Sequence, residues 1–404
     1  MRTKVAIPLL SAFLPVQAAV SSEDSESFIS KGLGLINGTV RAYYVTRQFD
    51  SKPDQHTFSP GGSLRLETPP LHGVQVGLGY YWQHDFGISS DKPERQVVPI
   101  FTGKDVDILG EAYLKFSAFD TVITAGRQKL TTPFANPADA FPVPTLFEGV
   151  SLIHSVGNFS FGGYYLSKIK DRPSNEFENV GKFSTRRLGV TPEKTDGTII
   201  GNIGYTNGGL GLEGWFYRFS DLFDMGLVQA KYITPEIHGF KFSFGAQGVL
   251  QQDQGQSLFG PMDSLGYGFT VGAATRRVDL IFSYNGVADR PGAFRNGAIL
   301  APYSYSNTTL FTNNLVSSPE NADSGSVYKV GLNYRVAPNF SFLLSHAVFN
   351  FNNKPHIAET DIDWKYGLDR FIKNLSLRNR IGIITSEAKS SDMVDLRVQL
   401  EYTF

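Results

Sequence analysis

Hydrophobic and polar residues alternate with a period of two along most of this chain. The clearest run is 393–404, where every second residue is apolar and the residues between them are mostly polar. The apolar positions are Val394, Leu396, Val398, Leu400, Tyr402 and Phe404. Successive side chains of a β-strand point to opposite faces. The run therefore predicts a strand with one apolar face and one polar face.

Runs of this kind predict about eighteen strands. They start near residues 35, 62, 73, 105, 121, 149, 159, 197, 209, 225, 239, 265, 277, 326, 340, 359, 375 and 393. Short turns are expected at 69–73, 117–120, 157–158, 206–208, 235–239 and 337–339. Long connections are expected at 48–61, 84–104, 128–148, 169–196, 251–264 and 287–325. This alternation of short and long connections is typical of an outer-membrane barrel. We expect an all-β fold, a single antiparallel transmembrane barrel.

The N-terminus has the pattern of a secretory signal peptide. Arg2 and Lys4 precede an apolar run, and residues 16–18 resemble a small-residue cleavage site. We expect residues 1–18 to be removed and residues 19–404 to form the barrel. No later stretch offers the about 18 consecutive apolar residues of a transmembrane helix.

The composition excludes several kinds of function. The chain has 32 Phe, 18 Tyr, 41 Gly and no Cys, so it offers no thiol nucleophile and no cysteine-ligated metal. Its net charge of −1 becomes −3 without the signal peptide, which carries two positive charges and no negative one. A nucleic-acid partner would need a strongly basic face instead. We predict no cofactor, no metal site and no nucleic-acid partner.

Two further patterns suggest chemistry but are better explained by structure. Residues 209–214 match G-x-G-x-x-G, yet an aromatic strand follows them, whereas a dinucleotide site needs a helix there. His72 and His238 lie in two similar Thr-Pro turns about eight strands apart, so we interpret them as turn residues rather than as a metal pair.

Segment 125–149 resembles the third-loop signature of the OprD family of outer-membrane channels. A strand ending in glycine gives way to a loop with proline and aspartate, which closes with a Pro-x-x-Phe-x-Gly phrase at 144–149. The stretches 35–49, 72–87 and 395–404 also resemble strands of that family, and the resemblance runs from about residue 28 to the C-terminus. Many members carry an arginine shortly after the loop aspartate, where this chain has Ala140 and Phe141.

The resemblance implies an 18-stranded channel in the outer membrane of a Gram-negative bacterium. It also implies that the third loop folds into the lumen and that small carboxylates, amino acids or similar polar solutes enter passively, through a selective rather than a general-diffusion pore. The constriction-loop residues would be Arg127, Pro133, Asn136, Asp139, Phe141, Phe147 and Glu148.

The alternation also assigns charged residues to the lumen. The basic ones are Arg41, Arg47, Arg335, Lys365, Arg378, Arg380 and Arg397, on strands that form one arc if the last strand pairs with the first. Aligned basic groups could guide a carboxylate along this wall, with Asp107 and Glu111 on the opposite wall. Alternatively, the basic residues only balance the acidic residues of the same arc, which are Asp361, Asp363, Asp395 and Glu401.

Two other functions remain alternatives. A barrel hydrolase would need a nucleophile or activated water beside a base, and no histidine lies in a recognisable catalytic phrase. A non-conducting receptor or adhesin would use long surface loops, for which 287–325, rich in Asn, Ser, Tyr and Pro, is the best candidate. The expected partners are membrane lipid, small polar solutes and, through the terminal Phe404 strand, the barrel-assembly machinery. Both a monomer and a homotrimer are compatible with the sequence.

Overall fold

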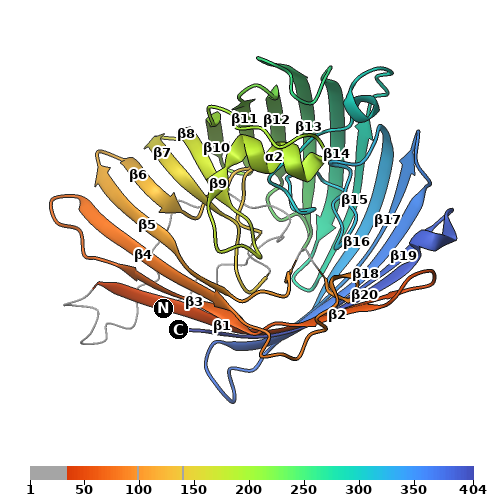
Figure 1. The fold of residues 1–404 in the computed structure, drawn as a ribbon, viewed down its shortest axis with the longest axis horizontal. Helices are drawn as coiled ribbons and strands as arrows, with labels where there is room; N and C mark the ends of the chain where they lie inside the picture. The colour runs from red at the N-terminus through yellow and green to blue at the C-terminus, as the bar shows by residue number, and fades with distance from the viewer. Residues whose placement is uncertain (1–33, 98–99, 139–140) are drawn as a thin grey trace.

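The strands of the chain form one closed antiparallel sheet. The computed structural model describes residues 34–97, 100–138 and 141–404, and every strand within them belongs to this sheet. Figure 1 shows the sheet curving round on itself, so that red β1 (Leu35–Phe49) lies beside blue β20 (Met393–Thr403). The expected signal peptide, residues 1–18, lies outside the described residues.

Eighteen strands make up the barrel wall in the described residues, as the sequence predicts. Each begins within a few residues of its predicted start. Between β1 and β20 they are β3 (Gly61–Glu67), β4 (Val74–Gln83), β5 (Val106–Ala118), β6 (Thr121–Gln128), β7 (Leu146–Val156), β8 (Phe159–Lys170), β10 (Thr198–Asn207), β11 (Leu210–Phe219), β12 (Phe223–Ile233), β13 (Lys241–Asp253), β14 (Asp263–Ala274), β15 (Val278–Val287), β16 (Gly325–Ala337), β17 (Phe340–Phe351), β18 (Ile357–Gly367) and β19 (Leu375–Ser386).

Shorter elements lie in the long connections. β2 (Gln55–Phe58) pairs with the end of β1, and β9 (Glu178–Asn179) with the end of β8. The helix α2 (Val180–Leu188) begins at Asn179, whose side chain accepts bonds from two backbone N–H groups, and ends at Gly189 in the left-handed conformation. The 3-10 turns are η1 (Pro93–Arg95), η2 (Phe294–Gly297) and η3 (Lys389–Ser391). No helix in the described ranges is long and apolar enough to cross a membrane.

The pairing of β1 with β20 closes the barrel. The two strands are in register from Thr39 opposite Thr403 to Phe49 opposite Met393. The terminal Phe404 extends this ladder, because its backbone N–H and C=O both bond to Gly38 at 3.0 Å. A free sheet edge in lipid would leave such groups without partners, at a cost of several kcal/mol each.

The wall has an apolar outer face, and its inner face is polar along part of the barrel. On β13, Phe244 and Leu250 are 48% and 55% exposed, whereas the alternating Ser243 and Gln247 are 5% and 6% exposed. On the other strands too, the exposed apolar side chains are those that meet lipid. The inner face of β11 is aromatic instead of polar, because Trp215, Tyr217 and Phe219 are buried in a hydrophobic cluster with residues of the long connections. The alternation read from the sequence is thus the division between lipid and lumen.

The two Thr-Pro turns have the same backbone geometry. His72 and His238 have φ of 50° and 49°, and each is followed by a glycine with φ of 83°. The histidines therefore occupy left-handed positions in the β3–β4 and β12–β13 turns, as expected of turn residues.

A β-bulge in β5 corrects one prediction. The pairing of β5 with β4 skips Gly110, so the two halves of β5 have opposite phases. Glu111 faces inward, as predicted. Asp107, however, falls on the outer face, where it accepts a hydrogen bond of 2.6 Å from the hydroxyl of Tyr80. Asp107 therefore does not line the pore, because strict alternation fails across the bulge.

Candidate pore-lining site

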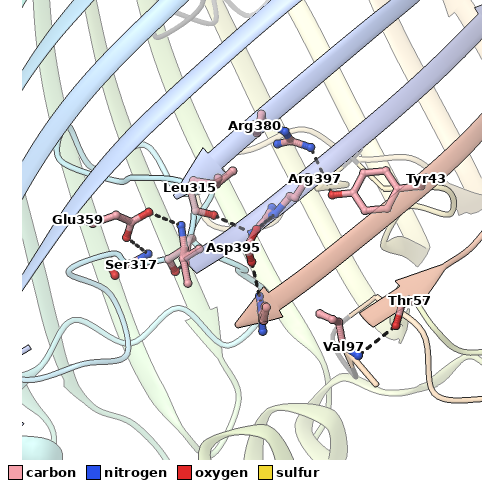
Figure 2. A network of polar contacts seen from close by, with 12 residues as sticks. Tyr43, Thr57, Val97, Leu315, Ser317, Glu359, Arg380, Asp395 and Arg397 are labelled. Carbon is pink, nitrogen blue, oxygen red and sulfur yellow. Dashed lines mark hydrogen bonds and ion pairs between the residues drawn. The ribbon is translucent and has the colours of Figure 1, made fainter. Parts of the chain in front are cut away.

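The predicted basic residues lie on the inward phase of their strands. Arg41 and Arg47 alternate with outward residues of β1 and share its inner face with the fully buried Tyr43. The others lie on β16, β18, β19 and β20: Arg335, Lys365, Arg378, Arg380 and Arg397. Because β20 pairs with both β19 and β1, most of these side chains share one wall. Figure 2 shows Arg380, Arg397 and Tyr43 together on that wall.

Most of these charges are neutralised within the wall. Asp395 is fully buried and accepts from Nε of Arg397 at 2.6 Å and from Nε of Arg47 at 2.8 Å. The remaining ion pairs are Arg41–Glu401, Arg335–Asp279 and Arg378–Asp363. An arginine that is held by a carboxylate presents little net charge to a passing solute. These five arginines therefore balance acidic residues and do not form a row of free positive charges.

Arg380 and Lys365 differ from the others. Within the part of the chain that the structure describes, neither has a carboxylate within ion-pair distance. Arg380 is 7% exposed, and Nη2 donates to the hydroxyl of Tyr43 at 3.4 Å. Arg397 lies opposite it on β20. A guanidinium has five N–H donors, so Arg380 keeps both its charge and most of its bonding capacity.

The adjoining part of the wall, formed by β3 to β5 and joined to β1 through β3, is also internally paired. Glu111 is 1% exposed and accepts from Nη2 of Arg65 at 2.7 Å and from the hydroxyl of Tyr81. Glu67 accepts from Nζ of Lys115 at 2.6 Å. Glu111 thus lies on the lumen side, as predicted, but its charge is compensated by Arg65.

The connection between β6 and β7, residues 129–145, contacts two distant parts of the wall. The N–H of Phe134 donates to the hydroxyl of Tyr217 on β11 at 3.3 Å. The carbonyl of Phe141 accepts a bond from Arg41 on β1. Figure 1 shows that β1 and β11 lie on different sides of the barrel. The amide of Asn136 donates to the carbonyl of Asn307 at 2.9 Å, which ties this connection to the one between β15 and β16.

The other residues expected in this loop have different positions. Pro133 lies in a tight turn closed by a 2.8 Å bond from Thr132 to Ala135. Phe147 is fully buried at the start of β7, with its ring 5.7 Å from that of Tyr303. Asp139 lies outside the described residues.

Arg127 and Glu148 lie neither in the β6–β7 connection nor on the lumen side of the wall. They face each other across β6 and β7 as an ion pair of 3.1 Å, to which Lys168 adds a second bond to Glu148 at 2.6 Å. Glu148 shares its face of β7 with the exposed Val150 and Leu152. The pair therefore lies on the outer side of the wall. The prediction is wrong because these residues already belong to strands, whose alternation turns them outward.

The connection between β15 and β16, residues 288–324, is buried against the inner wall instead of being exposed. Its residues 298–301 are fully buried. Leu300 exchanges backbone bonds of 2.7 and 2.8 Å with the Gln251 side chain on β13, and the Tyr303 hydroxyl lies 2.6 Å from that of Thr198 on β10. Further on, the segment bonds to β15, β16, β18 and β20. The expectation that 287–325 forms a surface loop is therefore wrong.

A model of a protein family decides the identity. The model described as outer membrane porin, OprD family, matches residues 105–404, about three quarters of the sequence. The chain belongs to the OprD family. It is an outer-membrane channel of Gram-negative bacteria for the uptake of small substrates, and it is not an enzyme.

Solved structures share the fold of this OprD-family porin at low sequence identity. OccK9 (OpdG) of Pseudomonas aeruginosa is 17% identical, with a TM-score of 0.79 over 94% of this chain and 100% of that one. A BenF-like porin from Pseudomonas fluorescens Pf-5 is 11% identical, with a TM-score of 0.79 over 91% and 98%. OpdK of Pseudomonas aeruginosa, solved with vanillate, is 13% identical, with a TM-score of 0.75 over 91% and 98%. None of the curated proteins compared with the chain matches it.

Inward-facing glycines are the sequence signal for the buried connection in this porin. A Cβ added at Gly266 would lie 2.9 Å from Cδ1 of Ile299, and one at Gly245 would lie 3.1 Å from the ring of Phe311. These glycines leave room on the inner face for side chains of residues 288–324. A glycine at an inward position of a barrel strand can therefore indicate that a loop approaches there.

Proposed function

We propose that this porin mediates passive, partly selective uptake of small carboxylates and amino-acid-like solutes through its charged lumen, with Arg380 as the main guiding group. The observation that carries this proposal is the imbalance of charge on one wall. Five arginines there have carboxylate partners, whereas Arg380 has none within the described residues. Lys365, on the neighbouring strand β18, adds a second unbalanced charge. A cationic wall attracts anions and fixes their orientation through hydrogen bonds.

We also propose that the β6–β7 connection lies in the lumen and narrows it. Its contacts with β1 and β11 support this, because a segment outside the barrel could not reach both strands. Its bond to Asn307 gives it a second support inside the barrel. A narrow passage keeps a solute close to Arg380, where the electrostatic interaction is strongest.

One structure with the same fold contains a bound carboxylate. OpdK was solved with vanillate, which is a carboxylate. At 13% identity this likeness shows the fold alone, so the substrate class of the present chain rests on its own lumen charges.

Two features of biogenesis belong to the same proposal. Residues 1–18 act as a signal peptide, and the terminal strand with Phe404 is recognised by the barrel-assembly machinery. The second point is supported by the closing position of that strand and by the two backbone bonds of Phe404 to Gly38.

Single-channel recording in planar bilayers tests the proposed function. The purified porin should give discrete conductance steps, and reversal potentials in a salt gradient should show preference for anions. Arg380→Gln should lower this preference and slow the uptake of small carboxylates into proteoliposomes. A chain that inserts but does not conduct, or an Arg380→Gln variant with unchanged reversal potential and uptake, would overturn the proposal.

A further inference from the structure

A single turn of the β15–β16 connection is fastened to the barrel wall by two carboxylates. The N–H of Leu315 donates to Oδ2 of Asp361 at 2.9 Å. The N–H groups of Val316 and Ser317 donate to Oε1 and Oε2 of Glu359 at 2.8 and 2.7 Å. Both acids lie on the inner face of β18, and Figure 2 shows Glu359 with its bonds to this turn. Three consecutive backbone N–H groups are thus bound by two neighbouring side chains.

The surroundings of the two acids favour this role. Glu359 is fully buried and Asp361 is 5% exposed, yet neither has an ion pair with an arginine or lysine in the described residues. Lys329 on β16 interacts electrostatically with both, and it donates to the carbonyl of Asn313 in the same turn. Buried carboxylates need hydrogen bonds in place of water. Here most of those bonds come from the backbone of the turn.

A carboxylate suits the pair of bonds at Glu359 in particular. An ionised carboxylate is an acceptor at both oxygens, so Glu359 can receive two N–H groups at once. A glutamine at this position would direct its NH2 group toward one of the two donors. That donor would be left buried and without a partner, which is costlier than a bond that was never formed.

The turn is held beside the unbalanced arginine. The carbonyl of Leu315 accepts from Nη2 of Arg397 at 3.4 Å. Its side chain fits against Gly382 on β19, where an added Cβ would lie 3.4 Å from Cδ2 of Leu315. Gly382 is two residues from Arg380 along the inner face of the same strand. The position of the turn therefore determines how much space remains beside Arg380.

We propose that Glu359 and Asp361 are positioning residues for transport, which hold the turn of residues 313–317 against the wall and so set the width of the passage beside Arg380. The inference rests on the proposed channel function, but it concerns residues that need not touch the solute. Loss of the carboxylates detaches the turn, and the pore then becomes wider on average and fluctuates.

Recordings of Glu359→Gln, Asp361→Ala and the double variant test this inference. Asp361→Ala removes the acceptor of the Leu315 N–H, which an asparagine would keep. Each charge-assisted bond that is lost should shift the ratio of detached to attached turn by about tenfold or more. The expected result is a higher mean conductance and increased open-channel noise, greatest in the double variant, in barrels that still show the heat-modifiable folded band. If the double variant does not fold, Glu359→Gln alone carries the same prediction.

Glu67→Gln is the matched control. It removes one inward carboxylate from β3, where Glu67 contacts Lys115, Tyr113 and Gln75 and not the turn. A merely electrostatic role for Glu359 predicts the same reversal-potential shift in both variants and no added noise in either. That outcome would overturn the inference. Wild-type noise and conductance in all of the variants of the two acids would overturn it as well.

A reversible crosslink between the turn and β19 tests whether the position of the turn itself controls conductance. The chain has no cysteine, so Leu315→Cys with Gly382→Cys places a single disulfide pair between turn and wall. In the Glu359→Gln background, oxidation should restore the quiet wild-type trace and reduction should abolish it again. A trace that stays noisy after oxidation contradicts the inference. A wild-type protein that does not conduct at all would instead contradict the proposed function.

Discussion

A carboxylate that neutralises an arginine should affect ion selectivity as strongly as a free arginine does. Asp363 provides the test, because it binds Arg378 through Nε at 2.9 and 3.1 Å and also through Nη2. Asp363→Asn keeps the shape and an acceptor oxygen but removes the charge. Arg378 is then left unbalanced, two residues from Arg380 on the inner face of β19. We expect preference for anions to increase.

The size of the effect follows from the spacing of a strand. Two residues rise about 7 Å, so a solute carboxylate at Arg380 lies roughly this far from Arg378. One added charge at about 7 Å contributes about 0.6 kcal/mol in a water-like dielectric and about 2.4 kcal/mol at an effective dielectric constant of 20. Anion occupancy should therefore increase between about threefold and about fiftyfold. The increase should shrink with salt, since the Debye length is about 8 Å at 0.15 M.

The assay is the anion-to-cation permeability ratio from reversal potentials at two ionic strengths. Asp363→Asn should raise the ratio, and Arg380→Gln should lower it. The control is the double variant Arg378→Gln with Asp363→Asn, which removes a neutral pair and should match the wild type. An unchanged ratio in Asp363→Asn, or a shift in the double variant as large as in either single one, would refute this view of the ion pairs.

Three further results are expected. Deleting Phe404 should lower the heat-modifiable, membrane-inserted fraction in cells, because its ring and backbone complete the β1–β20 seam; unchanged insertion would place the signal elsewhere. Burial raises the pKa of Glu320, which lies in the β15–β16 connection. Ionising it therefore opposes folding increasingly as pH rises above the ordinary glutamate range, so Glu320→Gln should raise the melting temperature near neutral pH and not in acid. Asp107→Cys should react with a membrane-impermeant thiol reagent on intact cells, whereas Glu111→Cys should not, and equal labelling would contradict the bulge at Gly110.

The strands were predictable because the environment imposes their pattern. Lipid outside requires an apolar residue at every second position of a wall strand, and β13 and β20 satisfy this requirement over most of their length. Because connections in an antiparallel barrel join adjacent strands, the order of the strands along the chain then gives their order in the sheet. The closing partner of β20 also follows, because an unpaired edge in lipid is excluded.

The remaining features depend on contacts that the local pattern does not contain. The bulge at Gly110 shifts the alternation by one residue, so strict alternation places Asp107 on the wrong face. The sequence places Arg127 and Glu148 in a loop because it defines strand ends only to within a few residues. The polar composition of residues 288–324 resembles that of an exposed loop, since a polar lumen and the external water select similar residues. Ion pairing across strands requires the register, which the sequence alone does not give.

The seam explains why the arginines of one wall differ in function despite their common type and phase. Arg41–Glu401 and Arg47–Asp395 both cross from β1 to β20, and Asp395 also holds Arg397. These charges therefore join the last strand to the first. Removing Asp395 would leave the buried guanidinium of Arg397 and the half-buried one of Arg47 without a counter-charge, a loss of about 3–5 kcal/mol, which is a folding effect. Arg380 lies one strand from the seam and bonds to no carboxylate in the described residues. Its charge contributes little to closure, and for that reason we propose that it acts on the solute.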